Sequence, residues 1–337
     1  MIRRFTSVFV LIASLITSAA AQEHVTVATT RDVANAALFL AAARGYFKAE
    51  GLALEMLAYP DAPAAAKALG TDAADLGLAA FSATAFALAG SGKIKAIAAQ
   101  VREWRSYEGN EVVASTAAYG RGLHGLRDLA GKSIALNALG GIFHYELAQI
   151  ARHKGFRLKG VVLKPLQSFD AVAQAVADGK VDAAILPPLY ARELLAANQA
   201  RPVGWYSELD EQQLGALFAT AKTLANRHAM VKKFLNAYRH GAADYAAAML
   251  RHDSYGKLRI DAKARAAAAA IGLYIYPGRD PNSTTPVVAS GVYYMDAQAR
   301  LDLPDLERQV AWFKEQGLID RNSDAHTMVD MDYIAGR

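Results

Sequence analysis

The chain is 337 residues long, contains no cysteine, and carries a formal net charge of +5, of which Arg3 and Arg4 supply two. The missing cysteine excludes disulfide frameworks, thiolate metal sites and a lipid anchor attached to a leader cysteine. The basic excess is weak and contains no run of five like charges, which argues against nucleic-acid binding, and the length favours two domains or lobes.

Residues 1–21 have the pattern of a cleavable secretory signal. Arg3 and Arg4 precede an apolar run that ends in Ala19-Ala20-Ala21, a small-residue pattern typical of cleavage sites. The run is shorter than the roughly 20 residues of a bilayer span, and no stop-transfer charges follow it, so an uncleaved membrane anchor is the less favoured interpretation. We expect an exported, soluble protein that begins at Gln22.

From residue 24 onward, short apolar runs alternate with helical patterns. The first block predicts strands at 24–29, 52–57, 74–79 and 94–101, with helices at 36–48, 62–69 and 81–89. The alternation restarts at Lys132 with strands at 133–137, 161–165 and 181–186, and helices at 142–154, 169–177 and 188–197. Such strand–helix–strand units predict mostly parallel sheets covered by helices on both faces.

The last third of the chain has a different pattern. It predicts one more strand at 217–220, long helices over 224–251, a loop rich in proline and glycine at 276–286, and an amphipathic helix at 303–316 that stops at Gly317.

Motifs that resemble enzyme signatures lack the context that those signatures require. Gly120–Gly125 matches G-x-G-x-x-G, but the segment before the next strand is too short for a crossover helix. Gly131-Lys132-Ser133 precedes a strand rather than the helix of a phosphate-binding loop. No serine-nucleophile elbow and no histidine pair with zinc-site spacing is present. We expect no catalytic residue, no cofactor and no metal site.

A different kind of site is indicated at the ends of the strands. Ligands of open α/β sheets bind beyond the carboxyl ends of parallel strands, where loops and helix N-termini meet. The residues predicted to bind a ligand gather at these positions or near them, and they are Thr30, Arg31, Asn35, Tyr59, Phe81, Ser82, Arg105, Asn137, Gly140, Gly141, Ile142, His144, Pro187 and Tyr190.

The residue types at these positions suggest an anionic solute. Helix N-termini offer unpaired N–H groups that suit carboxylate, sulfonate or phosphate. Arg31 and Arg105 are the candidates for a counter-charge, while Gly140-Gly141 allows the backbone to approach a ligand. At every position, ordinary capping or core packing remains the alternative.

Four segments carry a resemblance to a known family. Ala41 to Leu52 fits A-x-x-x-G-Y-F-x-x-E-G-L, and Leu126 to Ala135 fits L-x-D-L-x-G-K-x-I-A. Ala175 to Ala183 fits A-L-x-x-G-x-V-D-A except for Val176, and 315–319 resembles the family's closing helix. The chain resembles the periplasmic binding proteins of ABC importers for nitrate, sulfonates, taurine and thiamine-type pyrimidines.

The resemblance implies a two-lobed α/β fold of the periplasmic binding protein type II, with two crossing hinge segments and a ligand cleft. Lobe 1 is expected to comprise residues 22–113 and 207–337, and lobe 2 residues 114–206, with crossings near Val113 and at 205–215. The expected function is capture of a small organic anion, a sulfonate or an aromatic or aliphatic carboxylate, by hinge closure. The expected partners are the solute and an inner-membrane permease, and the expected state is a periplasmic monomer.

Three alternatives remain open. In the first alternative, the solute is a thiamine-type pyrimidine. In the second, the protein binds a solute and reports it to a receptor. The third is an enzyme on the same scaffold. A fungal branch of the family makes the thiamine pyrimidine and carries a cysteine-rich motif, which this chain lacks. We therefore expect a binding protein rather than an enzyme.

Overall fold

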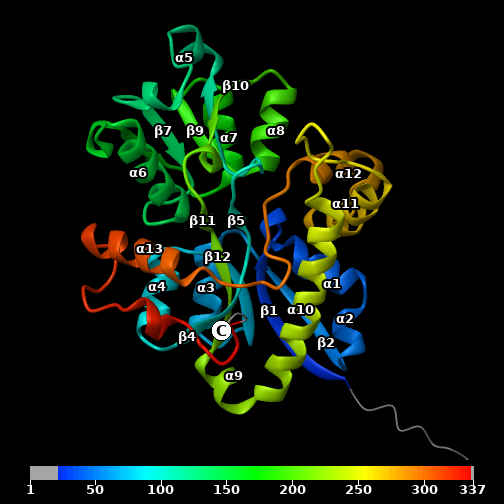
Figure 1. Cartoon of the computed structure of the whole chain (residues 1–337). Helices are drawn as coiled ribbons and strands as arrows, with labels where there is room; N and C mark the ends of the chain where they lie inside the picture. The colour runs from blue at the N-terminus through cyan, green and yellow to red at the C-terminus, as the bar shows by residue number, and fades with distance from the viewer. Residues whose placement is uncertain (1–21, 335–337) are drawn as a thin grey trace, which may run out of the picture.

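The structure, a computed structural model, describes residues 22–334, so the predicted signal at 1–21 lies outside the described residues. The described residues form two five-stranded sheets covered by helices, which lie one above the other in Figure 1. We call the part built on the first sheet lobe 1 and the part built on the second sheet lobe 2.

The sheet of lobe 1 has the strand order β2 (Leu52–Tyr59), β1 (Glu23–Thr30), β3 (Leu76–Ala80), β12 (Gly215–Thr220) and β4 (Ile94–Ala99). β1 runs parallel to β2 and β3, whereas β12 runs antiparallel to β3 and β4. One strand of the sheet is therefore reversed.

The sheet of lobe 2 has the order β10 (Ala200–Trp205), β6 (Glu111–Ser115), β9 (Ala183–Leu186), β7 (Ser133–Leu136) and β8 (Val162–Pro165). β7 is parallel to β8 and β9, and β6 is antiparallel to β9 and β10. The reversed strands are β6 and β12. The chain passes from lobe 1 into β6 of lobe 2, and later returns from lobe 2 into β12 of lobe 1. The prediction of two mostly parallel sheets is confirmed.

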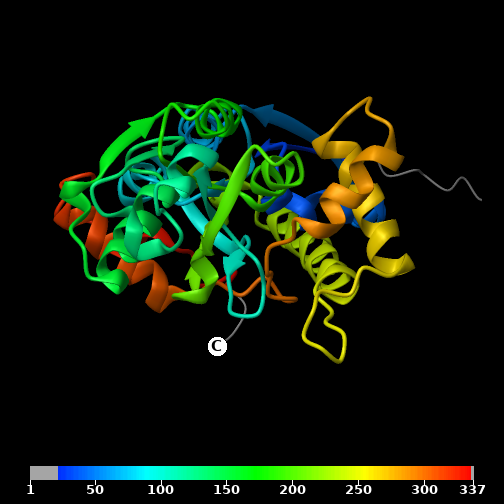
Figure 2. The same ribbon diagram turned by 90° about the horizontal axis from the view of Figure 1, so that it is seen from above.

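The helices cover both sheets (Figure 1). The four of lobe 2 are α5 (Thr116–Gly120), α6 (Ile142–Lys154), α7 (Phe169–Ala177) and α8 (Pro188–Ala196). The others are α1 (Ala36–Ala43), α2 (Tyr46–Ala49), α3 (Ala62–Gly70), α4 (Ala83–Gly90), α9 (Ala221–Asn226), α10 (His228–Met249), α11 (Ala262–Ile275), α12 (Pro281–Ser290) and α13 (Leu303–Glu315). Seen from above in Figure 2, α11 and α12 lie on one side of the molecule and α13 on the opposite side.

Two short strands connect the lobes. β5 (Arg102–Glu103) and β11 (Gln212–Gln213) pair in antiparallel fashion and form a two-stranded ribbon between the sheets. Val113, near which the first crossing was predicted, is fully buried inside β6. The predicted segment 205–215 does contain β11. We propose to place the first lobe boundary before Glu111 rather than after residue 113.

Two local predictions need correction. The helix expected at 36–48 is divided into α1 and α2, because Gly45 adopts a left-handed φ of 74° between them. The loop expected at 276–286 contains the start of α12. Pro281 occupies its first turn, where no N–H is needed, and the side chain of Asp280 caps it by accepting from Asn282 N.

Small residues let α10 (His228–Met249) pack closely against α1. α10 has 22 residues and packs against α1 at Gly241, where a Cβ atom would overlap the backbone oxygen of Ala37 and the side chain of Ala41. No helix within residues 22–334 combines the length and the apolar character needed to cross a membrane.

Candidate functional site

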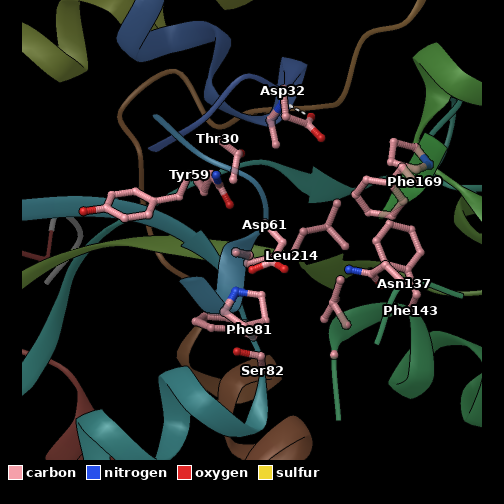
Figure 3. Close-up of a pocket in the computed structure, with 18 of the residues that line it drawn as sticks. Thr30, Asp32, Tyr59, Asp61, Phe81, Ser82, Asn137, Phe143, Phe169 and Leu214 are labelled. Carbon is pink, nitrogen blue, oxygen red and sulfur yellow. Dashed lines mark hydrogen bonds between the residues drawn. The ribbon is translucent and has the colours of Figure 1, made fainter. Parts of the chain in front are cut away.

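A cavity of about 470 Å³ lies between the two lobes, at the carboxyl ends of β1, β2 and β3 from lobe 1 and of β7, β8 and β9 from lobe 2. Figure 3 shows side chains from both lobes pointing into it. The lining residues are Thr30, Arg31, Asp32, Ala34, Ala58, Tyr59, Pro60, Asp61, Ala62, Pro63, Ala80, Phe81, Ser82, Gln100, Asn110, Asn137, Gly141, Ile142, Phe143, Phe169, Pro187, Tyr190, Leu214 and Tyr293.

The cavity brings together most of the residues predicted to bind a ligand. Those that line it are Thr30, Arg31, Tyr59, Phe81, Ser82, Asn137, Gly141, Ile142, Pro187 and Tyr190. Their contact with a ligand stays a prediction. Asn35, Arg105, Gly140 and His144 do not line this cavity.

Asn35 lies behind the cavity wall and supports it. Its amide Nδ2 donates to the backbone oxygen and to Oγ1 of Thr30, both at 2.9 Å. Its Oδ1 accepts from Gln100 Nε2 at 2.6 Å, and Asn35 is only 1% exposed. Asn35 therefore fixes Thr30 and Gln100, which do line the cavity.

Arg105 was predicted as a counter-charge, and its position does not support that role. It is exposed in the turn that follows β5, because the chain leaves lobe 1 after Gln100 and not near Val113. Arg31 is the one arginine of the described residues that lines the cavity.

Gly140 forms a contact between the lobes instead of a wall of the cavity. Its φ of 69° turns the backbone so that its oxygen accepts from Ala83 N of lobe 1 at 2.8 Å. Ser82 and Gly141 form an isolated antiparallel bridge beside this bond. We call these four residues the latch, and they hold the two lobes together over the cavity.

His144 supports the latch from within lobe 2. Its Nδ1 accepts from Gly140 N at 3.1 Å, and burial lowers the pKa of the imidazole. The ring stands edge-on to Trp312 of α13, 5.2 Å between centroids. His144 is therefore a packed residue of the lobe contact.

The lobe 1 side of the cavity carries two carboxylates that sequence reasoning missed. Asp32 Oδ1 accepts from Ala34 N at 2.8 Å and Asp61 Oδ1 accepts from Ala64 N at 2.7 Å, so each caps a helix start. Desolvation in the cavity wall raises the pKa of Asp32. Within residues 22–334 neither side chain forms an ion pair.

The lobe 2 side leaves two helix starts without a side-chain cap. α6 begins after Gly141 and α8 begins after Pro187, and neither residue bonds the first turn through its side chain. Asn137 is 8% exposed, and its Oδ1 forms no hydrogen bond with the described residues. Phe143 and Phe169 pack edge-on, 5.1 Å apart, and provide an aromatic wall beside Asn137 (Figure 3).

The floor of the cavity lies over a buried polar cluster at the crossing. Asn110 Nδ2 donates to Glu146 Oε1 at 2.7 Å, and Tyr293 Oη donates to Asn110 Oδ1 at 2.5 Å. The backbone N–H of Asn110 donates to Glu103 Oε1 at 2.8 Å. Glu103 and Glu146 are fully buried, and this burial raises the pKa of Glu103 to about 8 and that of Glu146 well above its usual range.

A second cavity of about 250 Å³ adjoins the first and shares Arg31, Asp32 and Tyr190 with it. Tyr276 and Arg279 of the segment before α12 line this second cavity. This segment therefore lies beside the mouth of the main cavity. No group of three or more metal-ligating His, Cys, Asp or Glu side chains occurs in the part of the chain that the structure describes.

Two lobes, a two-stranded crossing and a cavity between strand ends define a protein of the two-lobed periplasmic binding protein class. The family model described as NMT1/THI5 like matches residues 33–248, which is more than half of the chain. The chain belongs to this family. No curated protein sequence matches it significantly.

Solved structures with a similar fold include binding proteins and an enzyme. The periplasmic aliphatic sulphonate binding protein SsuA from Escherichia coli has a TM-score of 0.70 at 15% identity, with 92% of each chain covered. The alkanesulfonate-binding protein SsuA from Xanthomonas axonopodis pv. citri, bound to MOPS, has a TM-score of 0.69 at 18% identity, covering 93% of this chain and 99% of that chain.

The desulfurization enzyme DszB is also similar, with a TM-score of 0.59 at 17% identity and coverage of 92% of this chain and 97% of that chain. At these identities the likeness establishes the shared fold. Since a binding protein and an enzyme both use this fold, the choice between them depends on the chemistry of the site.

Proposed function

We propose that the protein is the periplasmic substrate-binding component of an ABC importer and that it captures a small organic anion by closure of its two lobes. The observation that carries this proposal is the cavity of about 470 Å³, which both lobes line and which the Ala83–Gly140 backbone bond closes. Its volume falls in the range that suits a small molecule. A hinge at β5 and β11 gives the lobes a connection about which they can open.

The chemistry of lobe 2 supports an anionic group on the solute, a sulfonate or a carboxylate. The uncapped first turn of α6 has N–H groups free for an acceptor, and the positive ends of α6 and α8 favour negative charge, although Pro187 and Pro188 at the start of α8 have no N–H to donate. Arg31 of lobe 1 adds a guanidinium at the cavity wall.

A thiamine-type pyrimidine is the second candidate, and the carboxylates of lobe 1 favour it. Asp32 and Asp61 are hydrogen-bond acceptors that suit an exocyclic amino group. The aromatic wall of Phe143 and Phe169 would pack on a flat ring.

We further propose that the protein binds its solute without transforming it. Among the described residues that line the cavity, there is no cysteine or histidine to serve as a nucleophile or general base. The remaining elements of the proposal are export to the periplasm, a monomeric state and delivery to an inner-membrane permease. Delivery to a receptor instead of a permease would use the same cavity.

A thermal-shift screen tests the proposal. The exported protein would be heated with alkyl and aryl sulfonates, aromatic and aliphatic carboxylates, nitrate and pyrimidines, since a ligand of the folded state raises the melting temperature. We expect a shift with one chemical class and its loss in Phe143→Ala. Tyr255→Ala, a surface aromatic with 88% exposure, is the matched control. The absence of any shift, together with no bound small molecule in native mass spectra, would refute the proposal.

A further inference from the structure

The two carboxylates of lobe 1 are unusual for a cavity that holds only an anion. One oxygen of Asp32 and one of Asp61 accept a backbone N–H, and no described residue donates to the second oxygen of either side chain. Both side chains are half-buried, and neither forms an ion pair in residues 22–334. Both line the cavity, so the natural partner of each free oxygen is a donor group of the solute.

Arg31 does not offset these charges. It is exposed, it borders both cavities, and it forms no ion pair with Asp32 or Asp61. The lobe 1 wall therefore presents two carboxylates against one exposed guanidinium, which favours a cationic group at that end of the solute.

The lobe 2 wall has the opposite character. Asn137 is more than nine-tenths buried, and its side chain makes no hydrogen bond with the described residues while it points into the cavity in Figure 3. It lies next to the uncapped start of α6, which is 13 residues long and carries the full positive end of a helix. The buried Oδ1 of Asn137 is an acceptor, but its Nδ2 has no hydrogen-bond partner among the described residues and can donate to an acid group beside the free start of α6, so the two donors together form a subsite for that group.

An apolar region separates the two polar ends. Leu214 lies between Asp61 and Asn137 in Figure 3, and the rings of Phe143 and Phe169 form the adjacent wall. From these features we infer that the solute is amphoteric: a protonated amine or similar cationic N–H donor faces Asp32 and Asp61, its acid group faces Asn137 and the start of α6, and an apolar body connects them. This inference rests on the proposed function and specifies its ligand class.

Probes of matched shape test the inference by isothermal titration calorimetry. The amphoteric probes are para-(aminomethyl)benzoate and para-(aminomethyl)benzenesulfonate. Para-toluate and para-toluenesulfonate keep the acid group but lack the amine, and para-methylbenzylamine keeps the amine but lacks the acid. We expect one amphoteric probe to bind at least about tenfold more tightly than both of its one-ended counterparts, as two additional charge-assisted contacts would require.

Variants then assign the amine to lobe 1. Asparagine is a good helix cap, so Asp32→Asn and Asp61→Asn keep the fold while they remove the charge. We expect each to weaken the amphoteric probe by about tenfold and to leave para-toluate or para-toluenesulfonate unchanged or tighter. Asp280→Asn is the control, because Asp280 caps α12 in the same manner and lies outside both cavities. Asn137→Ala should weaken all probes that carry an acid group.

The outcomes separate the inference from the proposed function. Acid probes that bind as tightly as their amphoteric counterparts, or amphoteric binding that survives both Asp32→Asn and Asp61→Asn, would overturn the inference and leave the binding function intact. Failure of every probe to bind, with no small molecule released from the denatured protein, would overturn both.

Discussion

The lobes contribute strand ends and helix starts of the same geometry to one cavity, but they complete the helix starts differently. In lobe 1, Asp32, Asp61 and Ser82 each bond a backbone N–H of the turn that follows. In lobe 2, Gly141 and Pro187 leave the starts of α6 and α8 without a side-chain cap, and only the start of α7 is capped, by Ser168. At a capped helix start, the side chain accepts a hydrogen bond from a backbone N–H of the first turn, and it adds an acceptor to the cavity wall. At an uncapped helix start, the backbone N–H groups of the first turn stay free for a ligand. The residue at the cap therefore decides the polarity of each wall.

The largest difference between the walls is expected in packing. Phe81 of lobe 1 is 1% exposed and stacks on Phe86 at 5.2 Å, so Phe81→Ala should lower the free energy of unfolding by about 3–5 kcal/mol. Both residues line the cavity, but Phe143→Ala in lobe 2 should cost less, because Phe143 has one aromatic neighbour, Phe169, whereas Phe81 packs on both Phe86 and Phe218. Urea denaturation of both variants measures the difference, and equal losses would show that the two walls are packed alike.

The acidic cluster beneath both walls should make stability depend on pH. Glutamate has an ordinary pKa of 4.5, and burial raises the pKa of Glu103 to about 8. Between these pH values the unfolded chain releases a proton that the folded protein keeps, so the free energy of unfolding falls as pH rises. We expect a loss on the order of 2 kcal/mol between pH 5 and pH 8.

Glu103→Gln should flatten this pH dependence, because the amide cannot ionise yet still accepts from Asn110 N. Urea denaturation at several pH values measures it, with the exposed Glu315→Gln as control. The facing groups are Glu146, Asn110 and Tyr293, and Glu146 shares the raised pKa. An unchanged slope in Glu103→Gln would assign the pH dependence to Glu146 or to Glu111, a further buried glutamate whose pKa burial raises to about 8.

A single substitution can convert the lobe 2 wall into the lobe 1 type. Gly141 has an extended backbone at the start of α6, so Gly141→Asp supplies the missing cap together with a negative charge. We expect anion binding to weaken by about tenfold while stability holds or rises by about 0.5 kcal/mol. Gly141→Ser supplies a cap without charge and should keep more of the affinity. Calorimetry with para-toluenesulfonate compares the two, and identical affinities would mean that charge at this wall has no influence.

The smallest expected effect concerns the latch. Gly140 and Gly92 have similar left-handed φ values of 69° and 75°, but only a Cβ at Gly140 would press on Ala83 of the other lobe, at 3.2 Å. Each alanine variant should lose about 1 kcal/mol of stability from backbone strain. Only Gly140→Ala should also weaken ligand binding, by a few-fold. Equal affinities in the two variants would show that the latch does not contribute to closure.

The alternation of apolar runs and helical patterns predicted both sheets, because central strands such as β3 and β9 are almost entirely buried and helices such as α7 and α13 bury one face. The position of the cavity followed from the rule that ligands of parallel sheets bind at carboxyl strand ends, and ten of the predicted residues line it. The rule works locally, since Thr30 ends β1, Asn137 follows β7 directly and Ser82 lies two residues after the end of β3.

Tertiary contacts set the rest of the site. Asn110 and Tyr293 meet at the cavity floor although they are 183 residues apart, and no local pattern indicates this pairing. Asp32 and Asp61 carry the local signal of helix caps, which gives no sign that their free oxygens face a cavity. Arg105 lies exposed in the turn after β5 and outside the cavity lining, and nothing in its local sequence indicates this position.

The bond between Ala83 N and Gly140 O uses main-chain atoms alone. Every solute that fits the cavity therefore meets the same closing bond, whatever its head group. The walls therefore set which solute is preferred, and the shared backbone bond adds the same increment of stability to the closed form with each of them.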